Sequence, residues 1–132
     1  MKKFIITTLL SIAFTSSFAE TSKVDFIVYF QQGSTELSEE SMDNLNDQIL
    51  SLNPSKVSII GHADEDRDSK KNFLLSQERA DSVKDFLIVR GLNSTTIESS
   101  LGAGQSDPSC FGKSKKCNAQ NRRVEVKVEY IK

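Results

Sequence analysis

The sequence predicts an α+β domain in which two helices pack on one face of a mixed sheet. Three observations predict this fold class. Short runs of β-branched and aromatic residues alternate with longer amphipathic segments, as strands alternate with helices. The order of these segments is strand, helix, strand, helix, strand, strand. The last strand alternates apolar and charged residues, so we expect one of its faces to be buried and the other to be exposed to solvent. We therefore expect a β-α-β-α-β-β two-layer sandwich.

The first strand and helix are expected before residue 55. Val24–Phe30 is rich in β-branched and aromatic residues and predicts a strand, which a loop over residues 31–37 follows. Ser38 is a typical N-cap, and two glutamates follow it in the first turn, where acids suit the helix dipole. Apolar residues then recur at helical spacing: Met42, Leu45, Ile49 and Leu52. Asn53-Pro54 ends this helix because a residue before proline disfavours the helical conformation.

The remaining elements follow the same alternation. Lys56–Gly61 predicts a second strand, and a long helix over Ser69–Arg90 ends at Gly91, a typical C-cap. Thr96–Leu101 predicts a third strand. Arg123–Ile131 predicts the last, with valines alternating with charged residues.

Polar residues lie in the middle of the apolar side of the long helix. That side is formed by Leu75, Ala80, Val83, Phe86 and Leu87, and it also carries Asn72, Ser76 and Arg79. A guanidinium there is costly unless another group offsets its charge. Asp64, at the end of the preceding strand, is the expected partner. We predict that Asp64 and Arg79 flank a recess and bind a ligand with both an ammonium and a carboxylate. The alternative is an internal salt bridge that only fixes the strand against the helix.

Residues 1–19 predict a cleaved secretory signal peptide. Lys2 and Lys3 give a positively charged N-terminal region, and residues 4–14 form an apolar stretch too short to span a bilayer. Small residues precede Glu20, as is typical of a cleavage site. We expect a single domain over residues 20–132 in the periplasm; the alternative is an uncleaved anchor. No later segment is expected to cross a membrane.

The expected mature chain has 15 basic and 18 acidic side chains, a net charge of −3. This mild acidity without a basic stripe argues against nucleic acid as a partner.

Cys110 and Cys117 are the two cysteines of the chain. In an exported protein they predict a disulfide that closes a short surface loop. The alternative is a redox or metal site, which two thiols with no nearby histidine fit poorly.

The spacing of several residues resembles a known family. Gly61-His62-Ala63-Asp64 is followed by Asn72, Leu75-Ser76 and Arg79-Ala80, and Asn121-Arg122-Arg123 precedes the last strand. These residues resemble the OmpA-like peptidoglycan-binding domain of outer-membrane porin-like proteins, peptidoglycan-associated lipoproteins and flagellar stator proteins. The resemblance covers about residues 24–130.

The resemblance implies non-covalent binding of peptidoglycan in a Gram-negative envelope, through the meso-diaminopimelate of the stem peptide. The acid matching Asp64 would hold an ammonium, and the arginine matching Arg79 a carboxylate, which a guanidinium can bind through two parallel hydrogen bonds. Further site residues implied in this way are Asn72, as a brace for Asp64 or the ligand, Leu75 and Val83, as an apolar wall, and Arg122 or Arg123, at the edge of the site.

The sequence departs from the family pattern at three places near this site. Gln31 stands where the first strand usually continues into an acid, Ala63 replaces a hydroxyl residue, and Arg67 replaces a glycine. The segment Asp64–Asp68 is more negative than usual. We expect these departures to affect affinity more than fold.

No catalytic residue, metal or cofactor is expected. His62 is the only histidine and is interpreted as structural, because no activated nucleophile accompanies it. Asp64–Asp68 lacks the central glycine and terminal glutamate of a calcium loop. We expect a protein partner in the envelope or a homodimer. The alternatives are a structural envelope subunit with a degenerate groove and a cell-wall peptide hydrolase.

Overall fold

The computed structural model describes residues 11–13 and 19–132, so most of the expected signal peptide lies outside the described residues. Four strands form one sheet in the order β1-β4-β2-β3: β1 (Thr21–Tyr29), β4 (Arg123–Ile131), β2 (Lys56–Gly61) and β3 (Ile97–Gly102). β4 is antiparallel to both of its neighbours, whereas β2 and β3 are parallel. The sheet is therefore mixed, as predicted.

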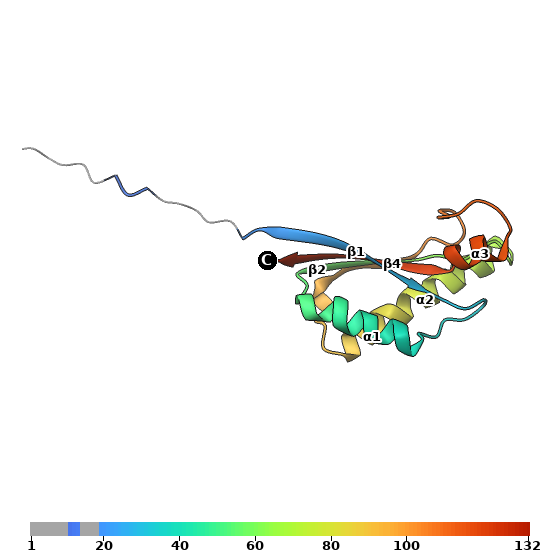
Figure 1. Cartoon of the computed structure of the whole chain (residues 1–132), viewed down its shortest axis with the longest axis horizontal. Helices are drawn as coiled ribbons and strands as arrows, with labels where there is room; N and C mark the ends of the chain where they lie inside the picture. Colours follow the sequence, from blue (N-terminus) through green and yellow to red (C-terminus); the bar gives the residue numbers. More distant parts are fainter. Residues whose placement is uncertain (1–10, 14–18) are drawn as a thin grey trace, which may run out of the picture.

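Two main helices lie on the same face of this sheet, α1 (Glu39–Gln48) and α2 (Ser69–Val89) (Figure 1). Ser38 caps α1, because its Oγ accepts a hydrogen bond from the amide of Ser41 at 3.1 Å. A 3-10 turn, η1 (Leu50–Leu52), follows α1, and another, η2 (Ser94–Thr96), precedes β3. These elements confirm the predicted two-layer arrangement.

A third helix, α3 (Lys115–Asn121), lies within the cysteine segment, where the sequence predicts only a loop. Ser114 begins it by accepting a hydrogen bond from the amide of Cys117 at 3.1 Å. The element order is therefore β-α-β-α-β-α-β. Figure 1 shows α3 at the end of the domain opposite to the C-terminus.

The core lies between the sheet and the two main helices. β4 contributes three buried valines at alternate positions, which confirms the predicted buried face of this strand. The buried hydrophobic cluster consists of Val28, Phe30, Leu45, Ile49, Val57, Ile59, Ala80, Val83, Leu87, Leu92, Val124, Val126 and Val128.

The N-terminal half of α2 packs very closely on the ends of β2 and β3, where both strands carry glycine. A Cβ at Gly61 would collide with the carbonyl oxygen of Ser76, and one at Gly102 would collide with the Ser76 hydroxyl. That hydroxyl accepts a hydrogen bond from the amide of Gly104 at 2.9 Å. The two glycines therefore set the distance between α2 and the sheet at the level of the predicted site.

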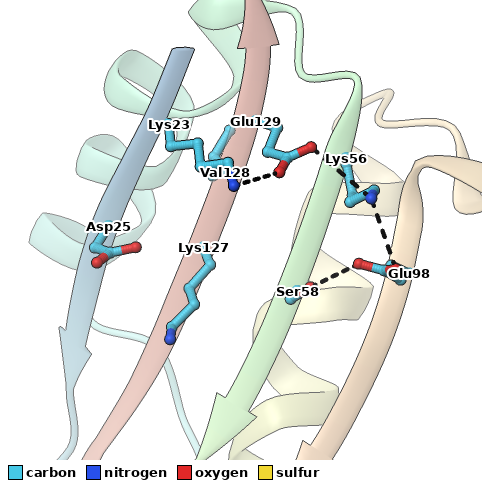
Figure 2. A pocket seen from close by; sticks show the side chains of 8 residues that line it. All are labelled: Lys23, Asp25, Lys56, Ser58, Glu98, Lys127, Val128 and Glu129. Atoms are coloured by element: carbon cyan, nitrogen blue, oxygen red, sulfur yellow. Dashed lines mark hydrogen bonds and ion pairs between the residues drawn. The ribbon is translucent and has the colours of Figure 1, made fainter. Parts of the chain in front are cut away.

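The other face of the sheet carries charged side chains in a ladder, which Figure 2 shows. Lys23 and Glu129 lie 3.2 Å apart, and Lys56 joins Glu129 to Glu98 at 3.9 and 3.7 Å. The hollow between these side chains has a volume of about 420 Å³ and shares no residue with the predicted site. Its three lysines and three acids balance, so the ladder gives this face little net charge.

Within the described ranges, no helix combines the length and the apolar character needed to span a bilayer.

Candidate functional site

Three predicted site residues lie beneath the surface, one just after β2 and two in α2. The exposed fractions of Asp64, Asn72 and Arg79 are 2%, 0% and 0%. The helical pattern placed Asn72 and Arg79 on the buried side of α2, and the structure confirms this. The open recess expected between Asp64 and Arg79 is not seen, because protein covers both side chains.

Arg79 is held by main-chain oxygens from two neighbouring segments. Its Nε donates to the carbonyl oxygen of Ser34 at 2.9 Å and its Nη2 to that of Gln31 at 3.3 Å, both in the turn after β1. Its Nη1 donates to the carbonyl oxygen of His62 at 3.0 Å, just after β2. The guanidinium also lies 5.4 Å from the ring centroid of Phe30.

Burial lowers the pKa of Arg79 to about 10, against the attraction of nearby Asp64. The side chain therefore stays cationic at neutral pH. A guanidinium has five N–H donors. The three carbonyl bonds use one N–H on each nitrogen, which leaves one on Nη1 and one on Nη2. No carboxylate lies within ion-pair distance of Arg79 in the described part of the chain.

Asp64 forms its ion pair with Arg122 rather than with Arg79, which corrects the predicted pairing. Arg122 Nη1 donates to Asp64 Oδ2 at 3.1 Å, and Arg122 Nε donates to the carbonyl oxygen of Phe30 at 3.0 Å. The second oxygen of Asp64, Oδ1, is buried and has no hydrogen-bond partner among the described residues. Burial raises the pKa of Asp64, and the neighbouring Asp66 carboxylate raises it further, while Arg122 opposes both effects.

Asn72 joins two loops instead of bracing Asp64. Its Nδ2 donates to the carbonyl oxygen of Arg67 at 3.0 Å and also to the Gln105 side chain. Its Oδ1 is buried without a partner among the described residues. Asp64 and Asn72 thus each have one buried oxygen without a hydrogen-bond partner among the described residues.

The other predicted site residues divide between the site and its surroundings. Arg122 belongs to the site, but Arg123 is directed elsewhere, with its Nη2 2.8 Å from Glu125 Oε1 and 3.1 Å from the carbonyl oxygen of Asp107. Leu75 and Val83 are buried, and Val83 belongs to the hydrophobic core.

His62 lies beside Arg123 and not beside Asp64. Its Nε2 is 3.7 Å from Glu125 Oε1. β2 ends at Gly61, so the alternation of side chains along this strand does not extend to His62 and Asp64. Burial lowers the pKa of His62, and Arg123 lowers it further, so the imidazole is neutral at pH 7.

The disulfide joins Cys110 and Cys117, with their Cα atoms 5.3 Å apart. Asn121 fixes the same loop. Its Oδ1 accepts from the amides of Ser109 and Cys110 at 2.9 and 3.1 Å, and its Nδ2 donates to the carbonyl oxygen of Cys110 at 2.9 Å. Because Arg122 follows Asn121 directly, this network also holds the residue that pairs with Asp64.

Two hollows border the site. One of about 330 Å³ lies between the end of β1, the start of α1 and α3, and shares Arg122, Phe30 and Gln31 with the site. The other, of about 120 Å³, has Glu65 on one side and the disulfide loop on the other.

Several site contacts had no signal in the sequence. The acceptors for Arg79 and Arg122 are main-chain oxygens of Phe30, Gln31, Ser34 and His62, and any residue type supplies such an oxygen.

Comparisons with known proteins identify a family to which this chain is similar. The OmpA family model matches residues 29–123. The chain is 33% identical over 101 residues to the peptidoglycan-associated lipoprotein of Pseudomonas aeruginosa, which covers 75% of this chain and 60% of the lipoprotein. It is also 33% identical over 105 residues to outer membrane protein A of Yersinia pseudotuberculosis, over 71% of this chain and 30% of that protein. The chain thus spans less than two thirds of the length of either relative.

The fold is also similar to that of a solved structure, the peptidoglycan-associated lipoprotein from Burkholderia pseudomallei. The TM-score is 0.72 at 27% identity, and the match covers 78% of this chain and 88% of that one. The family match includes the turn after β1, Asp64, all of α2 and Arg122. The chain belongs to the OmpA family.

Proposed function

We propose that this protein binds peptidoglycan non-covalently in the periplasm, through the diaminopimelate of the stem peptide. One observation supports the proposal most strongly. A buried, cationic Arg79 has no carboxylate within ion-pair distance, and the nearby Asp64 leaves its buried Oδ1 without a donor among the described residues. Asn72, on the same helix, also has a buried Oδ1 without a donor among these residues.

The charges of this cluster match a zwitterionic amino acid. Arg67, Arg79 and Arg122 carry three positive charges against the two carboxylates of Asp64 and Asp66, so a ligand carboxylate would balance the excess. A ligand ammonium would supply the donors that the unpaired oxygens lack. Diaminopimelate carries both groups. The names of the lipoprotein relatives from Pseudomonas and Burkholderia, which describe association with peptidoglycan, support this polymer as the binding partner.

Binding requires the site to open. Arg79 is covered by the turn that contains Gln31 and Ser34, and Asp64 by Arg122, whose side chain is 14% exposed. We infer that the ligand displaces this turn or Arg122. It then replaces main-chain and arginine contacts with its own carboxylate and ammonium.

The test is retention on purified diaminopimelate-type sacculi, with variants that preserve side-chain size. Asp64→Asn removes the charge that would attract the ammonium, and Arg79→Lys keeps the charge but loses the planar pair of donors. Asp85→Asn and Arg90→Lys make the same chemical changes at exposed positions near the end of α2 and serve as controls.

Wild type and both controls should be retained, while Asp64→Asn and Arg79→Lys should be lost to the supernatant. Circular dichroism must show that each variant is folded. Equal retention of all five proteins would refute the proposed site.

A further inference from the structure

The disulfide loop presents an exposed aromatic ring beside the candidate site. Phe111 is 87% exposed, the highest value among the large hydrophobic side chains of the described residues. It lies directly after Cys110, inside the ring closed by the disulfide. An apolar ring held in water by a rigid loop is available for contact with another molecule.

Three lysines follow Phe111 within the same segment of the chain: Lys113, Lys115 and Lys116. All are exposed, and none forms an ion pair in the part of the chain that the structure covers. Residues 108–124 contain these lysines and two arginines without a single acid, although the expected mature chain has a net charge of −3. The loop is therefore a local positive patch on an acidic protein.

The patch is continuous with the diaminopimelate site. Phe111 and Lys113 line the hollow of about 120 Å³ whose other wall includes Glu65, the residue after Asp64. Asn121 lines the same hollow and directly precedes Arg122. A ligand that extends out of the site past Glu65 therefore meets the loop. Figure 1 shows this loop and α3 together at one end of the domain.

The loop is also fixed before any ligand arrives. The disulfide closes it, and the Asn121 side chain makes three hydrogen bonds to the main chain of Ser109 and Cys110. A preorganised contact loses less conformational entropy on binding than a flexible one.

We propose that the disulfide loop is a second contact for the peptidoglycan polymer, with Phe111 against a sugar ring and the three lysines paired with stem-peptide carboxylates. This inference rests on the proposed function. Peptidoglycan supplies both the sugar ring and the carboxylates at short distance from the diaminopimelate. Two contacts on one polymer strengthen each other through effective concentration. An anionic membrane also matches lysines with an aromatic residue, but the continuity with the site favours the wall polymer.

The experiment compares an extended ligand with a minimal one. Binding to purified sacculi is measured by co-sedimentation, and binding to free meso-diaminopimelate by calorimetry. The loop variants are Phe111→Ser and the triple variant Lys113→Gln, Lys115→Gln, Lys116→Gln. The control is Lys70→Gln, Lys127→Gln, Lys132→Gln, which changes the net charge equally at exposed positions outside the loop.

Each loop variant should weaken sacculus binding roughly tenfold, as expected for several exposed contacts, and leave binding of free meso-diaminopimelate unchanged. The control triple should behave as wild type. Salt should weaken the sacculus binding of wild type more than that of the loop triple.

Two results would overturn the inference while leaving the proposed function intact. The first is that the loop variants bind sacculi as tightly as wild type. The second is that they lose binding only to vesicles of anionic phospholipid, which would identify a membrane contact. If wild type binds neither sacculi nor free meso-diaminopimelate, the proposed function itself fails.

Discussion

Asp64 and Arg122, 58 residues apart in the sequence, form an ion pair at 3.1 Å with exposed fractions of 2% and 14%. The pair connects the segment after β2 to the residue before β4. It gives Asp64 a counter-ion within the protein, whereas Arg79 forms hydrogen bonds only with main-chain oxygens of the described residues. The ligand-free site is therefore closed by its own charges.

Arg122→Gln should destabilise the protein by about 2 kcal/mol, because it leaves a buried carboxylate without its counter-ion. Asp64→Asn in the same background should recover most of this loss, because no unpaired charge remains. Urea unfolding of wild type, both single variants and the double variant measures the coupling free energy. Strictly additive effects would show that the contact contributes nothing to stability.

Acidification should weaken binding of meso-diaminopimelate at a pH above that at which an ordinary aspartate titrates. Burial raises the pKa of Asp64 above its usual 3.8, so the carboxylate takes up a proton, and loses its attraction for the ammonium, before an exposed aspartate would. Calorimetric titrations from pH 7 to pH 3 test this. A binding constant that stays flat until the pH reaches 3.8 would contradict the assigned role of Asp64.

His62 should make the free energy of unfolding fall as the solution becomes acidic. Its pKa in the folded protein lies below 6.5, so between that lowered pKa and 6.5 the unfolded chain binds more protons than the folded one. This contribution to stability is present above pH 6.5 and is lost as the pH falls through the folded pKa. His62→Gln should flatten the profile over this window, as measured by urea unfolding at a series of pH values. An identical slope in both proteins would show that His62 is not the group responsible.

Gly61→Ala should cost about 3 kcal/mol or more, because the new Cβ meets the main chain of α2 at Ser76 and the helix must move. Gly91→Ala is the matched comparison. Gly91 has φ of +109° but no atom within 4 Å of an added Cβ, so only backbone strain of about 1 kcal/mol is expected. Thermal unfolding of the two variants shows which substitution costs more stability. A larger loss of stability for Gly91→Ala than for Gly61→Ala would mean that α2 is not held closely against β2.

Removal of the disulfide by Cys110→Ser with Cys117→Ser should lower the free energy of unfolding by about 2.5 kcal/mol, from the entropy of the short closed loop. The comparison is urea unfolding of wild type with and without a reductant. Reductant should lower the stability of wild type to that of the variant and leave the variant unchanged. A wild-type protein insensitive to reductant would contradict this account of the loop.

The elements with strong local patterns were predicted well from the sequence. β2 and β4 have the predicted bounds, because a run of β-branched residues ends at Gly61 in β2 and valines alternate with charged residues along β4. α2 was predicted to within one residue from its apolar spacing. α3 was missed because its seven residues carry almost no apolar periodicity, and its start depends on a cap by Ser114.

The candidate site was predicted in composition but not in its internal pairing. The helical pattern indicated that Arg79 is buried near the end of β2, and the structure agrees. Whether Asp64 pairs with Arg79 or Arg122 depends on side-chain geometry across distant segments, which residue spacing does not encode. The main-chain carbonyl groups that bind Arg79 cannot be predicted from the sequence either, because every residue has one.

The most direct measurement of the central claim is a nuclear magnetic resonance titration of the folded protein with meso-diaminopimelate, following the Nε–H signal of Arg79 and the amides of Gln31 and Ser34. Saturable shifts of these signals, absent in Asp64→Asn, are the predicted result, because the ligand carboxylate must replace main-chain oxygens at Arg79. Unchanged signals at saturating ligand, or equal shifts in Asp64→Asn, would contradict the claim that these two residues bind the stem peptide.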